Sequence, residues 1–250
     1  MTAVPKTGAS PLDPDDLIDW FTANARPLPW RAPGTTGWGV LVSETMLQQT
    51  PVKRVQPVWE EWMRRWPKPS DLAAATQGEV LRAWGKLGYP RRAVRLHETA
   101  TVIATEHGDV VPSDVETLLS LPGVGEYTAR AVAAFAYGRR APVVDTNVRR
   151  VVARAVHGAG DAGPPSTKRD LADVAALLPE EDARAATMSA ALMELGQVIC
   201  TARSPLCQQC PVLADCAWNR AGRPAYAGPP KKVQKFAGTD RQVRGKLLDV

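Results

Sequence analysis

The sequence predicts an all-α fold, and three observations support this class. Apolar residues recur at helical spacing along most of the 250 residues. Short clusters of proline and glycine divide that pattern into segments of helical length. Strand signals are nearly absent, because the valine-containing runs at 110–111 and 142–144 are too short to count. With 44% hydrophobic residues, the chain has ample material to bury a core.

The first half of the pattern follows a polar, proline-rich segment at 1–12 that predicts a loose tail. A helix is expected at 13–25, because acidic residues in its first turn favour the positive end of the helix dipole. Residues 26–31 contain two prolines and therefore predict a structured loop. A helix at 38–49 follows, and Pro51 interrupts it. The remaining helices of this half are expected at 53–65, 70–75, 77–86 and 91–107.

The second half continues the helical pattern almost to residue 200, with further turn signals between the segments. Helices are expected at 114–120, 126–137, 145–157, 166–177 and 182–198. Beyond Cys216 the sequence turns polar and rich in glycine and proline, which is typical of a linker. An apolar pattern begins again at 241 and stops at Val250. We therefore expect 221–250 to be a linker and the start of a truncated or absent C-terminal region.

The charge balance is compatible with a nucleic-acid partner. The net charge is +5 and the pI is about 9.2, although many basic proteins bind no nucleic acid. No run approaches the roughly 18 apolar residues that a membrane span needs, and no N-terminal segment resembles a signal peptide. We therefore expect a cytoplasmic protein that does not enter the membrane.

All four cysteines lie close together near the end of the chain and form a possible ligand set. Cys200, Cys207, Cys210 and Cys216 follow the spacing C-x6-C-x2-C-x5-C. Structural zinc usually takes two close pairs, and here only one such pair exists, so the spacing favours a [4Fe–4S] cluster ahead of zinc. Disulfides are disfavoured because no signal peptide is visible. Buried core cysteines rarely cluster beside prolines and glutamines.

A glycine-containing turn at Leu121-Pro-Gly-Val-Gly125 separates two expected helices. Its two glycines permit backbone conformations that other residues resist. They also leave amide groups exposed at a helix N-terminus, where an anion such as a DNA phosphate is favoured. An ordinary tight turn between helices is the alternative interpretation.

This turn, followed by Thr128-Ala129 and the four-cysteine loop, resembles the helix-hairpin-helix DNA glycosylases of the endonuclease III superfamily. Within that superfamily the chain is most similar to the MutY-type adenine DNA glycosylases. The motifs that carry the similarity are Leu28-Pro-Trp-Arg31, Val42-Ser-Glu-Thr-Met-Leu-Gln-Gln-Thr-Pro51, Leu87-Gly-Tyr89 and Val144-Asp-Thr-Asn-Val-Arg-Arg150. The resemblance covers roughly residues 26 to 220. It implies that the four cysteines bind a [4Fe–4S] cluster, which would shape the 200–207 loop.

The resemblance implies two helical domains with the active site in the cleft between them. A central domain with the helix-hairpin-helix would span 32–140. A domain bearing the iron–sulfur cluster would combine 13–31 with 141–220. The reaction implied is removal of adenine mispaired with 8-oxoguanine or guanine in double-stranded DNA, by a monomeric enzyme that works at the bacterial nucleoid.

Two carboxylates suit this reaction, because the leaving base needs a proton and the sugar becomes cationic. Glu44 lies in a largely apolar helical segment, so partial burial would raise its pKa and keep it protonated. The resemblance assigns Glu44 the protonation of adenine at N7. It assigns Asp145 the stabilisation or capture of the sugar cation. The alternatives are a surface or ion-paired Glu44, and an Asp145 that only caps the following helix.

Tyr127 distinguishes this chain from bifunctional relatives. Those relatives carry a lysine at this position, and the lysine attacks the sugar to form a Schiff base. A phenol cannot form that imine. We therefore expect a monofunctional glycosylase in which Tyr127 assists the two carboxylates.

The resemblance also implies a pocket for the extruded base and a set of DNA contacts. The expected pocket residues are Arg26, Trp30, Arg31, Leu47 and Glu194, with Glu194 contacting adenine and Trp30 alternatively a core residue. Gln49 and Tyr89 are candidates to fill the vacated stack, and Gln48 beside Gln49 favours adenine. Pro90 stands where a second tyrosine is common, and it is a candidate wedge. Further DNA contacts are expected from Gly123, Gly125, Asn147, Arg149, Arg150 and Arg203. Arg91, Arg92 and Arg139 fit a solvated surface residue as well as a DNA contact.

Two other functions remain compatible with the sequence. A thymine or uracil mismatch glycosylase of the same superfamily can also carry tyrosine at the lysine position. A non-catalytic DNA-binding module could use the hairpin and cluster only for docking. The presence of both Glu44 and Asp145 argues against the second of these.

Overall fold

The computed structural model describes residues 12–229, together with Gly238, Gln242 and Val243. These residues form α-helices and short 3-10 turns, and no strand occurs among them. The α-helices are α1 (Pro14–Asn24), α2 (Gly37–Leu47), α3 (Val52–Arg65), α4 (Pro69–Ala73), α5 (Gln77–Trp84), α6 (Arg91–Glu106), α7 (Val115–Ser120), α8 (Glu126–Tyr137), α9 (Thr146–Ala155), α10 (Thr167–Ala175), α11 (Asp182–Val198) and α12 (Ala217–Arg220). The 3-10 turns are η1 (Pro29–Arg31), η2 (Gly85–Leu87) and η3 (Cys207–Gln209). The all-α expectation is confirmed.

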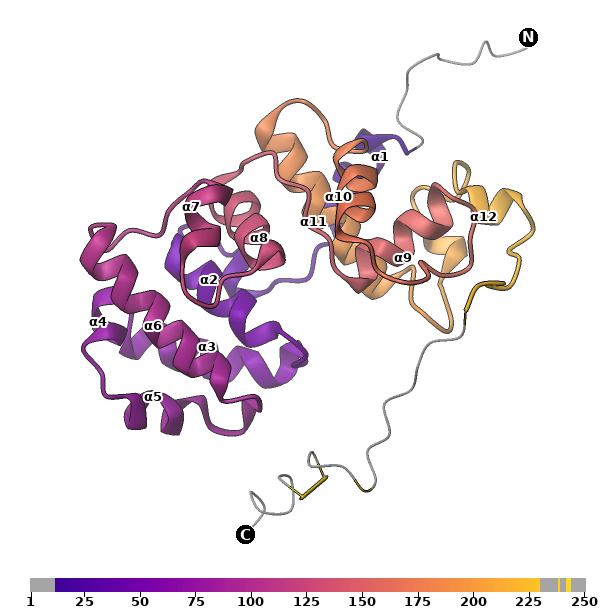
Figure 1. The fold of residues 1–250 in the computed structure, drawn as a ribbon. Helices are drawn as coiled ribbons and strands as arrows, with labels where there is room; N and C mark the ends of the chain where they lie inside the picture. Colours follow the sequence, from indigo (N-terminus) through magenta and orange to yellow (C-terminus); the bar gives the residue numbers. More distant parts are fainter. Residues whose placement is uncertain (1–11, 230–237, 239–241, 244–250) are drawn as a thin grey trace.

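The helices form two groups that lie side by side (Figure 1). Helices α2 to α8 enclose one apolar core, whose buried members run from Trp30 to Val143 and include Ala186. Helices α1 and α9 to α12 lie in the other group, where a second core contains Leu12, Leu17 and buried residues between Val148 and Val212. The chain therefore passes between the groups twice, once through 25–36 and once through 141–145.

Helix α2 is buried on nearly all its faces, which explains why its sequence is apolar around the whole circumference. Thr36 caps its N-terminus by accepting a hydrogen bond from the Gly39 amide. Gly39 allows Trp59 of α3 to pack closely, since a Cβ there would stand 3.3 Å from the Trp59 ring. This arrangement fixes α2 as the central helix of the first group.

Helix α11 runs along the border of the two groups and packs closely on the start of α9. A Cβ added at Gly196 would lie 2.8 Å from both the Cβ and the carbonyl oxygen of Asn147. Only a glycine permits this approach without a shift. The close packing brings the first turn of α9 beside the face of α11 that carries Met193 and Gln197.

The structure corrects the expected boundaries at both ends of the described chain. Leu12 was expected in the loose tail, but it is fully buried in the second core. The expected linker from 221 begins later, because 224–226 pack against Gly160 and the Trp218 indole donates to the Pro224 carbonyl. The rest of the expected tail and most of 230–250 lie outside the described residues. No helix among the described residues is long and apolar enough to span a membrane.

Candidate active site and cluster loop

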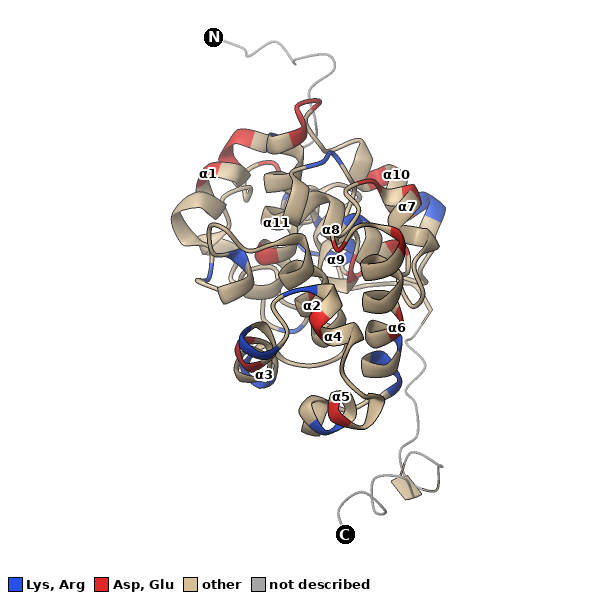
Figure 2. Ribbon diagram, turned by 90° about the vertical axis from the view of Figure 1, so that its left-hand side faces the viewer, with Lys and Arg blue, Asp and Glu red and all other residues tan. Residues whose placement is uncertain are grey.

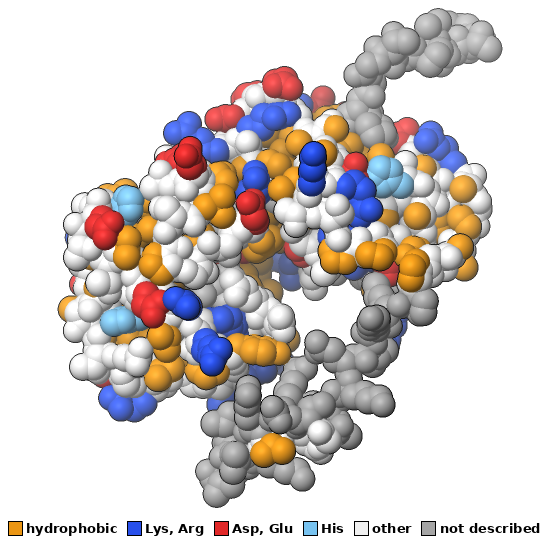
Figure 3. All heavy atoms as spheres, in the orientation of Figure 1, with side chains coloured by type: hydrophobic (Ala, Val, Ile, Leu, Met, Phe, Trp, Pro, Cys, Tyr) orange, Lys and Arg blue, Asp and Glu red, His pale blue; other side chains and the backbone are white. Residues whose placement is uncertain are grey.

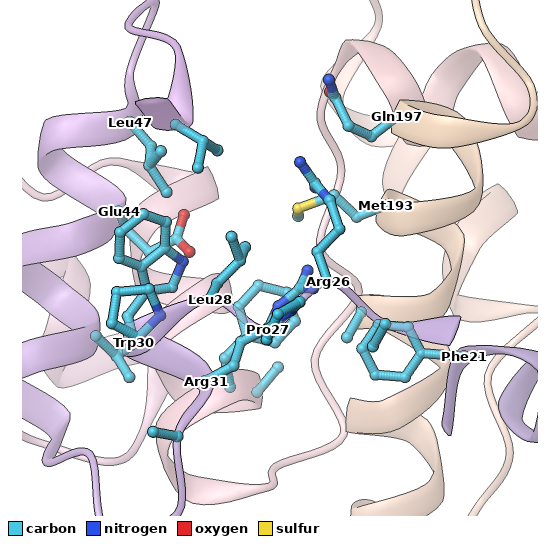
Figure 4. Close-up of a pocket in the computed structure, with 18 of the residues that line it drawn as sticks. Phe21, Arg26, Pro27, Leu28, Trp30, Arg31, Glu44, Leu47, Met193 and Gln197 are labelled. Carbon is cyan, nitrogen blue, oxygen red and sulfur yellow. The ribbon is translucent and has the colours of Figure 1, made fainter. Parts of the chain in front are cut away.

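A large cavity lies between the two groups of helices and has a volume of about 1050 Å³. Its walls come from α1, the 25–33 segment, α2, the start of α3, α8, the first turn of α9 and α11. Figure 3 shows a hollow between the two halves of the surface. In Figure 4, Glu44 and Leu47 lie on one wall, Met193 and Gln197 lie on the facing wall, and Arg26 lies between them.

Glu44 lines this cavity from the middle of α2 and is buried. Its Oε2 accepts a hydrogen bond of 2.9 Å from the Tyr127 hydroxyl. Burial raises the pKa of Glu44 to about 7, although the Tyr127 bond and the charge of Arg31 act in the opposite direction. Glu44 is therefore neither a surface carboxylate nor an ion-paired one. It can hold a proton near neutral pH.

Asp145 lines the same cavity and also caps α9, so its two interpretations are compatible. Its Oδ1 accepts from the amides of Asn147 at 2.9 Å and Val148 at 2.7 Å. Its Oδ2 accepts from the Asn147 side-chain amide at 2.7 Å. Burial raises the pKa of Asp145, while these hydrogen bonds favour the ionised form. The carboxylate is thus fixed in orientation by the helix that it caps.

Tyr127 connects the two carboxylates electrostatically. Burial and the nearby charges of Glu44 and Asp145 raise the pKa of its phenol well above the ordinary value. The phenol therefore stays protonated and donates to Glu44. Its oxygen also lies 3.9 Å from the Met193 sulfur, so Tyr127 touches the facing wall of the cavity.

Glu194 is the clearest correction to the expected pocket. It does not line the cavity, and its side chain is fully buried. Its carboxylate accepts from Arg26 Nε at 2.5 Å, Arg26 Nη2 at 2.8 Å and Arg31 Nη2 at 3.0 Å. These two arginines, rather than Glu194, face the cavity. The carboxylate lies behind them and holds them in place.

The other expected base contacts divide into cavity and surface residues. Trp30, Leu47 and Asn147 line the cavity, and Trp30 belongs to the first core as well. Gln48 points inward to the Thr128 hydroxyl, 3.4 Å away, and lies outside the cavity lining. Gln49 is exposed.

Tyr89 is exposed too, with about half of its surface accessible to solvent. It belongs to the turn that follows η2, at some distance in sequence from the cavity residues. Like Gln49, it has a positive φ angle, which is uncommon for a residue other than glycine. No residue pattern around Gln49 or Tyr89 predicts this shared conformation.

The hairpin at 121–125 places two exposed glycines before the first turn of α8. Gly123 and Gly125 are both exposed, and Gly125 caps the N-terminus of α8. Gly123 has a φ angle of +76°, and a Cβ there would lie 2.7 Å from the Arg95 Cβ. The Thr99 hydroxyl donates to the Pro122 carbonyl at 2.5 Å and ties the hairpin to α6. The hairpin is thus held rigidly with its amides at the surface.

Arg149 and Arg150 were expected to contact DNA phosphates, but both have internal partners. Arg149 Nε donates to Asp170 at 2.7 Å, and only 14% of the side chain is exposed. Arg150 donates to the carbonyls of Cys200 and Gly196 and to the Asn147 side chain. Neither guanidinium is therefore a free surface charge. Arg203, in the cluster loop, is exposed as expected.

The four cysteines surround a small cavity of about 30 Å³. Among the described residues, no group of three or more His, Cys, Asp or Glu side chains converges on one position for a single ion. Four cysteines spaced around a cavity suit a cluster, because each thiolate then binds a different iron atom. The cavity is otherwise mostly apolar, as a buried cluster requires. Four thiols that line one cavity fit the ligand set of a [4Fe–4S] cluster.

Arg154 of α9 contacts the cluster loop, and the sequence did not single it out. It is almost fully buried, and its Nη1 lies 3.4 Å from the Cys200 sulfur. It also donates to the carbonyls of Thr201 and Ala202 and stacks over the Trp218 ring. Its spacing of four residues from Arg150 places both on one face of α9, which is a signal that the sequence did contain.

Further cavity residues come from α1 and α11. Phe21 and Gln197 line the cavity, and Arg31 lies over the Phe21 ring at 5.3 Å. On α11, the lining residues recur at helical spacing as Ala186, Ala190, Met193 and Gln197. That periodicity was visible in the sequence, but the direction in which the helix face pointed was not.

Comparison with known proteins agrees with this geometry. Residues 42–176 match the family model of the HhH-GPD superfamily base excision DNA repair proteins. Residues 200–216, from the first cysteine to the last, match the iron–sulfur binding domain of endonuclease III. The chain therefore carries a [4Fe–4S] cluster in this loop.

Relatives resemble the chain over nearly its whole length. It is 62% identical to an adenine DNA glycosylase of Mycobacterium tuberculosis over 98% of this chain and 80% of that protein. It is 64% identical to an adenine DNA glycosylase of Mycolicibacterium smegmatis over 96% of this chain and 80% of that protein. The solved structure of a thermostable thymine-DNA glycosylase has a TM-score of 0.74 and 26% identity, covering 83% of this chain and 95% of its own. The chain therefore belongs to the adenine DNA glycosylases of the HhH-GPD superfamily of base excision DNA repair proteins.

Proposed function

We propose that this glycosylase removes adenine mispaired with 8-oxoguanine or guanine from double-stranded DNA and leaves an abasic site. The observation that carries the proposal is the pairing of a protonatable Glu44 with a fixed Asp145 in one cavity. We further propose that the enzyme acts as a monomer in the cytoplasm, at the nucleoid.

Glu44 acts as the acid in the proposed mechanism. A base leaves deoxyribose more readily once it is protonated, because it then departs as a neutral molecule. With a pKa of about 7, Glu44 carries the proton in a large fraction of molecules at neutral pH and can donate it to adenine N7. Tyr127 holds the carboxyl in place through its 2.9 Å hydrogen bond.

Asp145 stabilises the cationic sugar as the bond breaks, and water then adds to the sugar carbon and loses a proton, which gives the abasic site. Burial raises the pKa of Asp145, whereas two backbone amides and the Asn147 side chain donate to its carboxylate and favour the ionised form. A fixed negative charge costs no reorganisation when positive charge develops on the sugar. The negative charge of Asp145 also raises the pKa of Glu44, so an ionised Asp145 favours a protonated Glu44.

The cavity lining supports a monofunctional reaction. No lysine lines the cavity among the described residues, and Tyr127 occupies the position where bifunctional relatives carry one. Arg26 and Arg31 are the cations present, and a guanidinium stays protonated and does not form an imine at neutral pH. The [4Fe–4S] cluster, bound by Cys200, Cys207, Cys210 and Cys216, supplies structure to the loop that carries Arg203.

The test is single-turnover base release from matched duplexes. These contain adenine opposite 8-oxoguanine, adenine opposite guanine, and thymine opposite guanine. We expect release from the first two, loss of that release in Glu44→Gln with DNA binding retained, and no borohydride-trapped adduct. Preferential thymine release would instead show a thymine mismatch glycosylase. Binding without any release would show a DNA-binding module, and near-native release by Glu44→Gln would refute the mechanism.

A further inference from the structure

Arg92, in the first turn of α6, holds two separate turns together through one guanidinium. Its Nη1 donates to the carbonyls of Thr45 at 2.9 Å, Met46 at 2.9 Å and Gln48 at 2.7 Å. Its Nη2 donates to the Thr50 hydroxyl at 3.0 Å and to the carbonyls of Leu87 at 3.3 Å and Gly88 at 3.1 Å. One cation therefore joins the C-terminal end of α2 to the turn after η2. Of the two interpretations left open by the sequence, the solvated surface residue does not apply to Arg92, because its guanidinium is bound to the backbone.

The environment of Arg92 explains why the contact is specific to a guanidinium. No carboxylate pairs with it, and burial lowers its pKa. The carbonyls at the end of α2 lie at the negative end of the helix dipole, which favours a cation there. The guanidinium also lies over the rings of Trp84 at 5.0 Å and Tyr89 at 5.7 Å. A lysine could supply the charge but could not reach both turns with a planar fork of donors.

Each of the two turns contains an exposed residue in a strained backbone conformation. Gln49 has a φ angle of 57° and Tyr89 one of 48°. Each immediately follows a carbonyl that Arg92 holds, Gln48 in one turn and Gly88 in the other. Residues other than glycine keep such conformations only where the surroundings enforce them. Arg92 contacts both turns, and the Thr50 hydroxyl, to which Arg92 donates, also joins them through the carbonyls of Gln48 and Leu87.

Basic residues surround this pair on the surface. Lys53, Arg54, Lys86 and Arg91 are exposed on α3, η2 and the start of α6. Arg54 donates to the Lys86 carbonyl, which links the two sides of the pair. Figure 2 shows the positively charged residues of α3, α5 and α6 at the lower end of this view. A strand of DNA following these charges would pass over Gln49 and Tyr89.

We propose that Arg92 is a positioning residue that holds Gln49 and Tyr89 together as one wedge, which enters the DNA stack when adenine is extruded. The inference rests on the proposed function, since a wedge matters only if the base leaves the duplex. Arg92 touches neither the cavity nor Glu44. Its loss should therefore impair extrusion and leave the chemical step unchanged.

The first test compares paired and unpaired adenine. Arg92→Met should release adenine about tenfold more slowly from a duplex with adenine opposite guanine, because the strained turns are no longer held. The penalty should shrink markedly when adenine lies opposite an abasic site, where no base pair has to be broken. Arg92→Lys should give an intermediate effect in the same assay, and it serves as the test if Arg92→Met does not fold.

A double-mutant cycle identifies the residue through which Arg92 acts. Tyr89→Ala combined with Arg92→Met should be little slower than Tyr89→Ala alone, because the wedge is already lost. The pH midpoint of single-turnover release should match that of the wild-type enzyme in Arg92→Met, in Tyr89→Ala and in the double variant. A shifted midpoint would mean that Arg92 acts through Glu44 and would overturn the proposal.

Arg140→Met is the matched control. Arg140 is half-buried and likewise donates to backbone carbonyls, those of Pro179, Ala175 and Leu178, far from both turns. It should cost stability without a preference between the two substrates. Equal losses on paired and unpaired adenine in the Arg92 variants would refute the positioning role. Absence of adenine release by the wild-type enzyme would instead refute the proposed function.

Discussion

Glu44 shows how one side chain can be costly for folding and useful for the reaction. A carboxyl group buried on an apolar helix resists ionisation, and its pKa rises from 4.5 to about 7. The unfolded chain loses this proton at much lower pH than the folded one. Folding at alkaline pH must therefore either bury a charge or retain a proton, and both are unfavourable.

Glu44→Gln should consequently stabilise the protein at alkaline pH while abolishing base release. The carboxyl is neutral in both states below its unfolded pKa, so that region shows no pH-dependent penalty. The penalty grows as pH rises from 4.5 to about 7 and reaches about 3 kcal/mol at most above that range. Chemical denaturation of both proteins at about pH 4 and about pH 8 measures it. A constant difference between variant and wild type at the two pH values would contradict the prediction.

The sequence was informative about Glu44 and uninformative about Arg92 for the same physical reason. The apolar neighbours of Glu44 lie beside it in the chain, so its burial could be predicted from the local pattern. The partners of Arg92 at Thr45, Met46 and Gln48 lie more than forty residues away. Only the packing of α6 against the end of α2 brings them together.

At the scale of elements, the hairpin at 121–125 separates two uses of glycine. Gly123 needs its positive φ angle and the space beside Arg95, so any side chain there is strained. Gly125 has an extended φ angle of −102° and open space where a Cβ would lie. The fold therefore requires a glycine at position 123 but not at position 125, where the absence of a side chain leaves the backbone open to a ligand.

Two alanine substitutions should separate these roles. Gly123→Ala should lower the stability by about 1 kcal/mol or more and weaken DNA binding with it. Gly125→Ala should leave the melting temperature nearly unchanged and weaken binding alone, because the added methyl group holds a phosphate away from the amides. Thermal melts and binding at one fixed salt concentration measure both. Unchanged binding in both variants would exclude the hairpin as a phosphate site.

The helices themselves were predictable to within two residues at most ends, because proline, glycine and capping residues mark them locally. Asp145 illustrates this, since it was expected at the start of a helix and caps α9. Helix α12 and η3 were not expected. Both are short segments beside the cysteines, where tertiary contacts around the cluster loop replace any local helical signal.

At the scale of the whole molecule, the active site depends on how the two groups of helices are joined. Glu44 and Tyr127 come from one group, and Asp145 and Met193 come from the other side of the cavity. The division into 32–140 and 13–31 plus 141–220 stays a prediction. Two separate cores support a division, although Trp30, Ala141 and Val143 pack in the first core and not in that of their predicted domain. No local pattern in the sequence predicts how close the two groups of helices lie.

Glu194 is a buried charge that ties the crossing segment 25–36 to α11. It lies on α11 and binds Arg26 and Arg31, which belong to the segment leading into α2. Burial raises the pKa of Glu194, but the two arginines outweigh burial and the pKa is lowered. The bridge therefore contributes stability above the ordinary pKa of a glutamate and loses it as pH falls through the lowered value.

Glu194→Gln should lower the stability of the protein and move the pH dependence of base release to lower pH. Two partly buried arginines would lose their counter-charge. The free energy of unfolding should fall by about 3 kcal/mol at neutral pH, and by less in acid, where Glu194 itself is protonated. The uncompensated charge of Arg31, which already lowers the pKa of Glu44, would lower it further. The alkaline limb of the rate profile should then move to lower pH.

Denaturation and pH-dependent single-turnover release measure the two effects of Glu194→Gln. Glu180→Gln is the control, because its carboxylate is 96% exposed and lies 3.5 Å from Arg140, so neither quantity should change. If Glu194→Gln is destabilised but its alkaline limb does not move, the bridge holds the 25–36 segment against α11 and does not affect the pKa of Glu44. A limb displaced to higher pH would contradict the electrostatic assignment, because removing a negative charge beside Arg31 can only favour ionisation of Glu44.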